Sequence, residues 1–310
     1  MEALLQDRQL LYVTGKGGVG KTTVAAAIGL AAAEAGRRTI VCEVAEQDRV
    51  SRAFRREGVT AETEVELAEN LWAITIDPQR ALEEWLARQL GPGARLLTRA
   101  SAFQYFVAAA PGAKELITIA KVWELAQAER WDAKNRTYDL VVVDAPASGH
   151  GLAMLTTPRT FGEIARVGPI RRQAQKVRDL LTDPTRTGYV AVALPEEMPV
   201  VETLELERRL PDAVGLGLDA IVVNGVWPER FTNKDAELLR EASRNGHHPE
   251  AAEALRAALS EHGRARSQRT HLRRLKRESE AHVITLPFIF ETELGLPEYE
   301  RLADELARAL

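Results

Sequence analysis

The chain has 310 residues, of which 45% are hydrophobic and 28% charged, and its formal net charge is −4. A chain of this length and apolar content can bury a large core, and its slight acidity gives no indication of a nucleic-acid or anionic-membrane surface. Its single cysteine, Cys42, excludes an intrachain disulfide and any zinc or iron–sulfur site built from cysteines. No apolar stretch approaches the ~20 residues of a spanning helix, so we expect a cytoplasmic protein without stable membrane insertion.

The first predicted strand, residues 10–13, leads into a glycine-rich loop. This loop, residues 15–23, reads Gly-Lys-Gly-Gly-Val-Gly-Lys-Thr-Thr and matches the pattern G-x-x-x-x-G-K-[ST]. Its glycines let backbone N–H groups turn toward phosphate oxygens, and the helix expected over about 21–35 adds the positive end of its dipole. Lys21 can then reach the β- and γ-phosphates, while the hydroxyl of Thr22 ligates Mg²⁺. The sequence therefore predicts a site for Mg·ATP. Its expected ligands are Gly15, Lys16, Gly17, Gly18, Val19, Gly20, Lys21, Thr22 and Thr23.

Short β-rich runs alternate with helical patterns along the rest of the chain. Further strands are expected over residues 39–44, 71–76, 140–143, 190–194, 220–223 and 283–286. The runs at 140–143 and 190–194 are entirely apolar, which is typical of strands buried on both faces of a parallel sheet. This order predicts the α/β fold of a P-loop NTPase, a doubly wound and mostly parallel sheet, as one domain over residues 1–310.

Two helical stretches, at about 79–135 and 158–182, interrupt this alternation and predict an inserted helical subdomain. The first contains several aromatic residues, among them Trp85, Trp123 and Trp131. Aromatic residues at helical spacing usually belong to a core, so we expect them to pack the helices onto the sheet. The alternative, a groove or partner surface built from the same helices, stays open.

A second motif, residues 144–150, reads Asp-Ala-Pro-Ala-Ser-Gly-His and follows a buried strand directly. In nucleotide hydrolases an aspartate at this place holds the hydration shell of Mg²⁺ beside the loop threonine, so we expect Thr22 and Asp144 to bind the metal. The segment can bring backbone N–H groups near the γ-phosphate and move when it leaves. For its histidine, phosphate sensing and a local turn role both stay open. The expected switch residues are Asp144, Pro146, Gly149 and His150.

Lys16, an additional lysine near the start of the loop, marks a resemblance to ATPases with a deviant P-loop. Within that class the chain resembles the arsenical-pump and guided-entry ATPases most closely, and among them the shorter bacterial members found as paralogous pairs. The motif at 144–150 is similar to their D-T-A-P-T-G-H switch. Leu194-Pro195-Glu196 together with Glu202-Thr203 resembles their P-E-x₅-E-T element. The similarity extends from about residue 9 to 306.

The resemblance implies a Mg²⁺-dependent ATPase that acts as a homodimer, or as a heterodimer with a paralogous subunit, and it is compatible with a protein client. Lys21 would neutralise phosphate charge within its own subunit and Lys16 would do so across the dimer interface. Val222-Val223-Asn224 is similar to the strand end whose asparagine reads adenine, and Leu286-Pro287-Phe288 resembles the loop that covers the base. Asn224, Pro287 and Phe288 thus join the expected nucleotide site.

One position departs from the family pattern. The second strand of the family ends in D-P-A-H, whose aspartate positions the attacking water, and an ungapped alignment places Ala45 there. Alanine can neither orient nor deprotonate water. Glu43, on the same strand face, and Glu46, on the expected turn, are candidate replacements. Alternatively both are solvated turn carboxylates, and the subunit hydrolyses ATP slowly or not at all. We hypothesise weak hydrolysis with retained binding.

Three functions stay open from the sequence. The first is a slow ATPase that couples nucleotide state to contacts with a subunit or client, and the alternative is a catalytically weak scaffold for an active paralogue. The third is a DNA-partition ATPase, because residues 263–278 carry seven basic side chains on a predicted helix. Flanking glutamates favour a solvated helix face, so we expect no nucleic-acid partner. One cysteine and three methionines support neither an arsenite site nor a methionine-rich client groove.

Overall fold

The computed structural model describes residues 3–44, 49–54, 63–91, 112–132, 134–165, 167–245 and 249–309. The described strands are β1 (Leu10–Gly15), β2 (Thr39–Glu43), β3 (Val65–Ala68), β4 (Leu71–Thr75), β5 (Leu140–Asp144), β6 (Thr187–Ala193), β7 (Ala220–Val226) and β8 (His282–Pro287). They form one sheet in the order β3-β4-β2-β5-β1-β6-β7-β8. Neighbouring strands pair in parallel, except that β3 is antiparallel to β4. The predicted doubly wound, mostly parallel sheet is confirmed.

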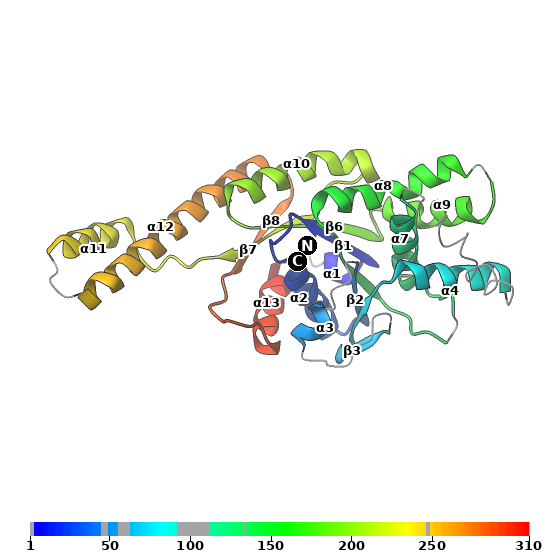
Figure 1. Cartoon of the computed structure of the whole chain (residues 1–310), viewed down its shortest axis with the longest axis horizontal. Helices are drawn as coiled ribbons and strands as arrows, with labels where there is room; N and C mark the ends of the chain where they lie inside the picture. Colours follow the sequence, from blue (N-terminus) through cyan, green and yellow to red (C-terminus); the bar gives the residue numbers. More distant parts are fainter. Residues whose placement is uncertain are drawn as a thin grey trace.

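Helices cover both faces of the sheet (Figure 1). On one face lie α1 (Ala3–Gln6), α2 (Lys21–Glu34), α3 (Arg49–Ala53) and α13 (Leu296–Ala309). On the other lie α7 (Ala113–Leu125), α8 (Ser148–Ile164), α9 (Pro169–Leu181), α10 (Glu197–Val214) and one end of α12 (Pro249–Glu278). Alternation along β1 separates the two cores, because successive side chains of a strand point to opposite faces. Leu11 and Val13 join the first core, whereas Leu10 and Tyr12 join the second.

The central strands are buried on both faces, which explains why their apolar runs are readable in the sequence. All residues of β1 and β6 are buried. β3 is the strand that the sequence did not predict. It has four residues, lies at the antiparallel edge of the sheet and is only partly buried, so it has no apolar run to mark it.

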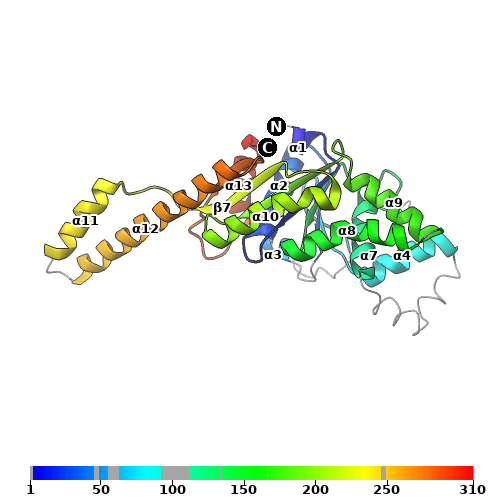
Figure 2. The same ribbon diagram turned by 90° about the horizontal axis from the view of Figure 1, so that it is seen from above.

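A group of helices packs beside one end of the sheet (Figures 1 and 2). It consists of α4 (Pro78–Leu90), α7, α8 and α9, which contact one another. The start of α4 is stabilised by an N-cap, since the side chain of Asp77 accepts a hydrogen bond from the backbone N–H of Arg80. Pro78 occupies the first turn, where a proline is favourable. Trp123 and Trp131 pack against the core as expected. Residues 92–111, which belong to the same predicted insertion, lie outside the described part of the chain.

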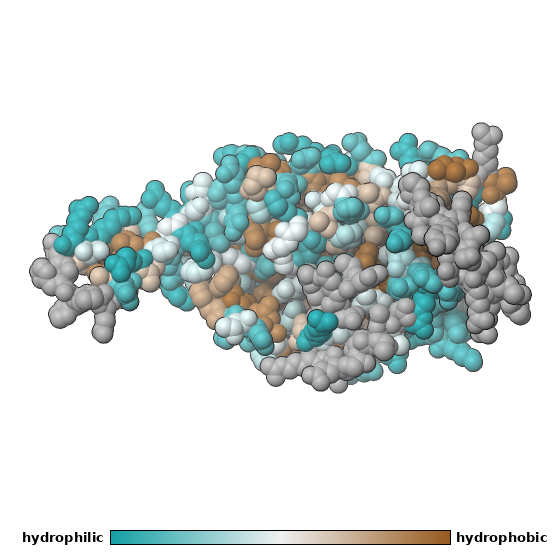
Figure 3. All heavy atoms as spheres, viewed as in Figure 1, coloured by the Kyte–Doolittle hydropathy of each residue, from teal (hydrophilic) through white to brown (hydrophobic). Residues whose placement is uncertain are grey.

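A helical hairpin projects from the opposite end of the molecule (Figures 1 and 2). It is formed by α11 (Asn233–Asn245) and α12, which has 30 residues and is therefore about 45 Å long. The hairpin is inserted between β7 and β8, the two strands expected to carry the base-reading residues. Its surface is mostly hydrophilic, while hydrophobic residues gather at its root (Figure 3). Among the described helices, none is both long and apolar enough to cross a bilayer.

Candidate phosphate and nucleotide site

The glycine-rich loop connects β1 to α2 and wraps the first turn of that helix. Gly20 precedes α2 with φ = 89°, a left-handed conformation that side chains rarely adopt. A Cβ atom at Gly20 would also collide with the side-chain amide of Asn224. This amide donates a hydrogen bond to the carbonyl of Val19 at 3.1 Å. The close approach therefore joins the phosphate loop directly to the end of β7.

The predicted metal ligands meet beside this loop. The hydroxyl of Thr22 donates a hydrogen bond of 2.6 Å to a carboxylate oxygen of Asp144. The sheet brings them together, because β1 and β5 are neighbours and Val13 is in register with Asp144. A hydroxyl and a carboxylate are the hard oxygen ligands that Mg²⁺ prefers, and Mg²⁺ usually takes only one or two such ligands from the protein. The two residues fit the expected ion.

The two lysines of the loop point to different partners. The ammonium of Lys21 donates to the backbone carbonyl of Lys16 at 2.9 Å, so it lies across the loop. The ammonium of Lys16 instead forms a 2.8 Å ion pair with Glu202 on α10. Both side chains of this pair are 32% exposed. Lys16 thus lies at the molecular surface, with a partner from its own chain.

Glu43 lies at the end of β2, in register with Asp144 on β5 and Thr75 on β4. It is only 2% exposed. The alternative that Glu43 is a solvated turn carboxylate is therefore wrong, because its strand runs in the middle of the sheet. Ala45 and Glu46 lie outside the described residues.

Tyr299 of α13 is a neighbour of this carboxylate that the sequence did not reveal. Burial raises the pKa of the Tyr299 phenol, a hydrogen bond with Thr23 lowers it, and the charge of Glu43 raises it again. Its ring packs on Phe54 at 5.2 Å between centroids. Tyr299 is thereby hydrogen-bonded to the end of the phosphate loop and lies within electrostatic range of Glu43. The only sequence signal was the amphipathic pattern of the last helix, which cannot identify its partners.

Among the predicted switch residues, Asp144 ends β5 and the others continue from there into α8. Pro146 lies before the helix, whereas Gly149 and His150 lie in its first turn. The helix starts close to β1, since the phenol of Tyr12 donates to the carbonyl of Gly151 at 3.0 Å. His150 is exposed there. His150 therefore lies in a helix. The expectation that it is a turn histidine is wrong, and phosphate sensing stays a prediction.

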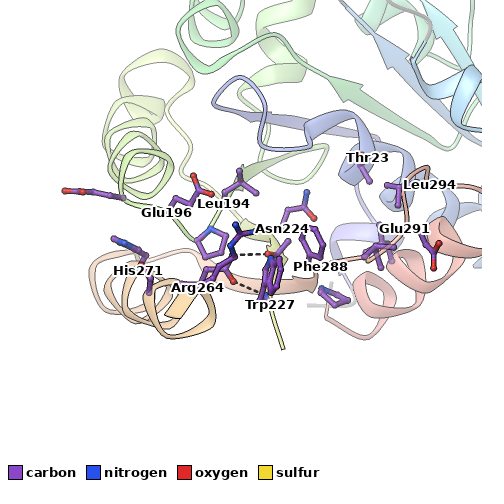
Figure 4. Close-up of a pocket in the computed structure, with 18 of the residues that line it drawn as sticks. Thr23, Leu194, Glu196, Asn224, Trp227, Arg264, His271, Phe288, Glu291 and Leu294 are labelled. Carbon is purple, nitrogen blue, oxygen red and sulfur yellow. Dashed lines mark hydrogen bonds between the residues drawn. The ribbon is translucent and has the colours of Figure 1, made fainter. Parts of the chain in front are cut away.

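The residues expected to bind the base line a cavity of about 880 Å³ (Figure 4). Thr23, Asn224, Pro287 and Phe288 all contribute to its wall, although they come from three separate segments. Residues that the sequence did not predict complete the lining. They are provided by the P-E-x₅-E-T element, by the segment after β7, by α12 and by the loop after β8, and include Glu196, Trp227, Arg264, Gln268 and His271. The cavity adjoins the phosphate loop at Thr23, so the arrangement can hold phosphates at one end and a base at the other.

Comparison with known proteins agrees with this geometry. The family model of anion-transporting ATPases matches residues 8–174 and 165–247. The chain is 32% identical to the ATPase BagA of Mycobacterium tuberculosis over 239 residues, which cover 74% of this chain and 69% of that protein. It is 26% identical to the ATPase GET3 of Lachancea thermotolerans, with 73% and 74% covered. It is 27% identical to an arsenical pump-driving ATPase of Escherichia coli, with 73% of this chain but only 41% of the pump protein covered.

Proposed function

The chain belongs to the anion-transporting ATPase family, and from this premise we propose that it binds Mg·ATP at residues 15–23 and hydrolyses it slowly. The observation that carries the proposal is the hydrogen bond between Thr22 and Asp144 beside the loop. The two oxygen ligands would hold Mg²⁺ between them and the phosphates, where the ion would neutralise the charge that develops on transfer to water. Lys21 would add a second positive charge from across the loop.

The test is phosphate release from ATP with and without Mg²⁺. Lys21→Ala should lower the rate by about 10² or more, because phosphoryl transfer depends mainly on positioned charge. Lys234→Ala, a change at an exposed lysine of α11, is the control and should leave the rate unchanged. A Mg²⁺-independent rate, or one that Lys21→Ala does not alter, would contradict the proposal.

We further propose that the chain lacks the family's water-positioning aspartate and that Glu43 is a candidate substitute. In favour of Glu43, its side chain is buried and its position on β2 is in register with Asp144. Glu43→Gln and Glu46→Gln should each be assayed, together with the double variant. If the double variant hydrolyses ATP at the original rate, neither glutamate acts on the water. Ala45→Asp should raise the rate if the missing aspartate limits hydrolysis.

We also propose that nucleotide state is coupled to contact with a second subunit, in a homodimer or in a heterodimer with a paralogous ATPase. Lys16 supports this because it is one-third exposed and pairs with Glu202 on α10, a helix that also exposes apolar side chains. Met198 and Val201 on that helix are 58% and 37% exposed. Light scattering with and without ATP should show a nucleotide-dependent increase in mass, and Met198→Asp should reduce it.

The second candidate is a catalytically weak subunit that supports an active paralogue. Ala45 favours it, because the family's water-positioning aspartate is missing. The two candidates differ in one measurement, the ATP turnover of this chain alone and with the paralogue. A rate for the mixture that equals the sum of the separate rates would count against the second candidate.

A protein client is a third element of the proposal. It is supported by an apolar cavity of about 330 Å³ between α4, α7, α8 and α9, with Trp85 and Ile170 in its lining. Ile164 at its edge is 70% exposed and the nearby Val167 is 84% exposed. Crosslinking in cells from a photoreactive residue at Ile164 should capture clients, and the same label at Arg209 on α10 should not.

A further inference from the structure

One wall of the 880 Å³ cavity is formed by the projecting hairpin. Five residues of α12 line it, and they recur on one side of the helix: Ser260, Arg264, Ser267, Gln268 and His271. The opposite walls come from the ends of β7 and β8. The middle of a long helix thus closes the outer side of the expected base site (Figure 4).

Gln268 makes the closest connection between α12 and the base-reading strand. Its side chain is 8% exposed, and its carbonyl oxygen accepts from the backbone N–H of Trp227 at 2.8 Å. Its amide nitrogen donates to the backbone carbonyl of Gly225 at 3.2 Å. The β7–β8 register shifts between Val223 and Val226, so the sheet ladder is interrupted here. Gln268 satisfies backbone groups at this interruption, directly after Asn224.

Arg264 acts on the same segment from one turn away. Its guanidinium lies 4.6 Å from the centroid of the Trp227 ring, a cation–π contact. Trp227 in turn packs against Phe288 at 5.0 Å and against Phe290 at 5.2 Å. The two phenylalanines are 37% and 49% exposed, although they are aromatic. An aromatic cluster that is open to a cavity offers a flat apolar surface to a ring of similar shape.

We propose that α12 is a functional wall of the base site, with Gln268 and Arg264 as positioning residues. Gln268 fixes the backbone that follows Asn224, and Arg264 holds Trp227 in the aromatic cluster on which a purine stacks. The proposal rests on the proposed binding of ATP at the phosphate loop. It concerns the base end of that ligand alone, because Gln268 and Arg264 contact the segment that follows Asn224 and not the expected metal ligands.

The experiment measures binding of Mg·ATP and of magnesium tripolyphosphate, which carries the phosphates without a base, by calorimetry. Gln268→Ala should weaken ATP binding about tenfold, because two hydrogen bonds to the backbone beside Asn224 are lost. Arg264→Ala should weaken it severalfold, and Arg264→Lys should restore part of the loss. Tripolyphosphate affinity should stay unchanged for all three variants.

Arg266→Ala is the matched control. Arg266 is exposed on the same helix, about 200° around its axis from Arg264. It should bind both ligands like the original chain. A thermal melt of each variant verifies that the hairpin is folded.

The outcomes separate the inference from the proposed function. If the original chain binds neither ligand, the proposed function and the inference both fail. If it binds both, but Gln268→Ala and Arg264→Ala bind ATP normally, the inference alone is wrong. If those variants lose ATP and tripolyphosphate equally, α12 has a general structural role and the inference is again overturned.

Discussion

Single residues set the shape of the phosphate loop through contacts with distant strands. Gly20 is the clearest case, because its left-handed backbone and the amide of Asn224 both exclude a side chain. Gly17, three residues earlier, has open space around its Cβ position and no such backbone conformation. The two glycines therefore have different physical roles within one motif.

We predict that Gly20→Ala lowers the free energy of unfolding by about 1–3 kcal/mol, the cost of placing a side chain in a strained backbone. Gly17→Ala should change it by less than about 0.5 kcal/mol. Denaturant unfolding without nucleotide is the measurement. Equal effects of the two substitutions would show that Asn224 does not constrain the loop.

Buried tyrosines give the protein a distinct response to alkaline pH. Burial raises the pKa of the phenols of Tyr12, Tyr138, Tyr189 and Tyr299 above 10. A raised pKa means that the folded state keeps the proton while the unfolded state loses it. The stabilisation is complete below pH 10 and declines as the pH rises above that value.

We therefore predict that the free energy of unfolding falls above pH 10, by up to about 1.4 kcal/mol per pH unit for each of these tyrosines. Tyr12→Phe should make the decline less steep, although it removes the hydrogen bond to Gly151. Equilibrium unfolding between pH 8.5 and 11 provides the slope. A slope that Tyr12→Phe leaves unaltered would exclude this phenol as a contributor.

At the scale of elements, a buried ionic network ties α7 to the segment that follows it. Glu124 is fully buried and pairs with Arg130 at 2.6 Å and with Lys121 at 3.0 Å. Arg130 also pairs with Glu64, close to β3. Burial alone would raise the pKa of Glu124, but the hydrogen bond and charge of Arg130 and the charge of Lys121 lower it. The helical group is thereby joined to the sheet edge by charges.

We predict that Arg130→Met destabilises the protein by about 3–5 kcal/mol, because it leaves buried Glu124 without its main partner. Arg159→Met, which breaks an exposed pair with Glu163, should cost less than about 1 kcal/mol. Since the pKa of Glu124 is lowered, its stabilisation is lost as the pH falls. Thermal melts at pH 7 and pH 4 should show the difference between the two variants shrinking at the lower pH.

At the scale of the whole molecule, the candidate nucleotide site contacts two helical elements, α10 on the sheet and the projecting hairpin. The phosphate loop contacts α10 through Lys16 and Glu202, and the base cavity contacts the hairpin through α12. The charge of residues 233–278 also differs from the remainder, with 11 basic and 7 acidic side chains in a chain of net charge −4. A ligand that bridges the loop and the cavity would restrain both parts together.

We predict that Mg·ATP slows amide hydrogen exchange in residues 260–271 of α12 as well as in the phosphate loop. The reason is that bound nucleotide stabilises the closed arrangement of the cavity walls. Residues 233–245 of α11 serve as the internal control, since they lie outside the cavity lining. Protection of the loop without protection of α12 would show that the hairpin is not coupled to the nucleotide.

Elements could be predicted from the sequence where a short stretch of residues carries the physical signal for the structure. Central strands such as β1 and β6 are short apolar runs buried on both faces, and the loop of residues 15–23 has a glycine pattern that few other structures require. β3 escaped prediction because it is a four-residue edge strand. A helix was expected over residues 263–278, but its pairing with α11 in a hairpin beside the cavity was not. The position of a helix relative to the candidate nucleotide site cannot be predicted from an amphipathic pattern.

The sequence by itself therefore determined the mostly parallel sheet, the glycine-rich loop and the pairing of Thr22 with Asp144, because these depend on local residue patterns along the chain. Its motifs also carried the resemblance to the family. Only the tertiary structure decided that Glu43 is buried, that Lys16 pairs with Glu202, that Tyr299 lies beside the loop and that α12 lines the cavity. The reason is that each of these contacts joins residues far apart in the sequence, and strand order and helix packing alone bring such residues together.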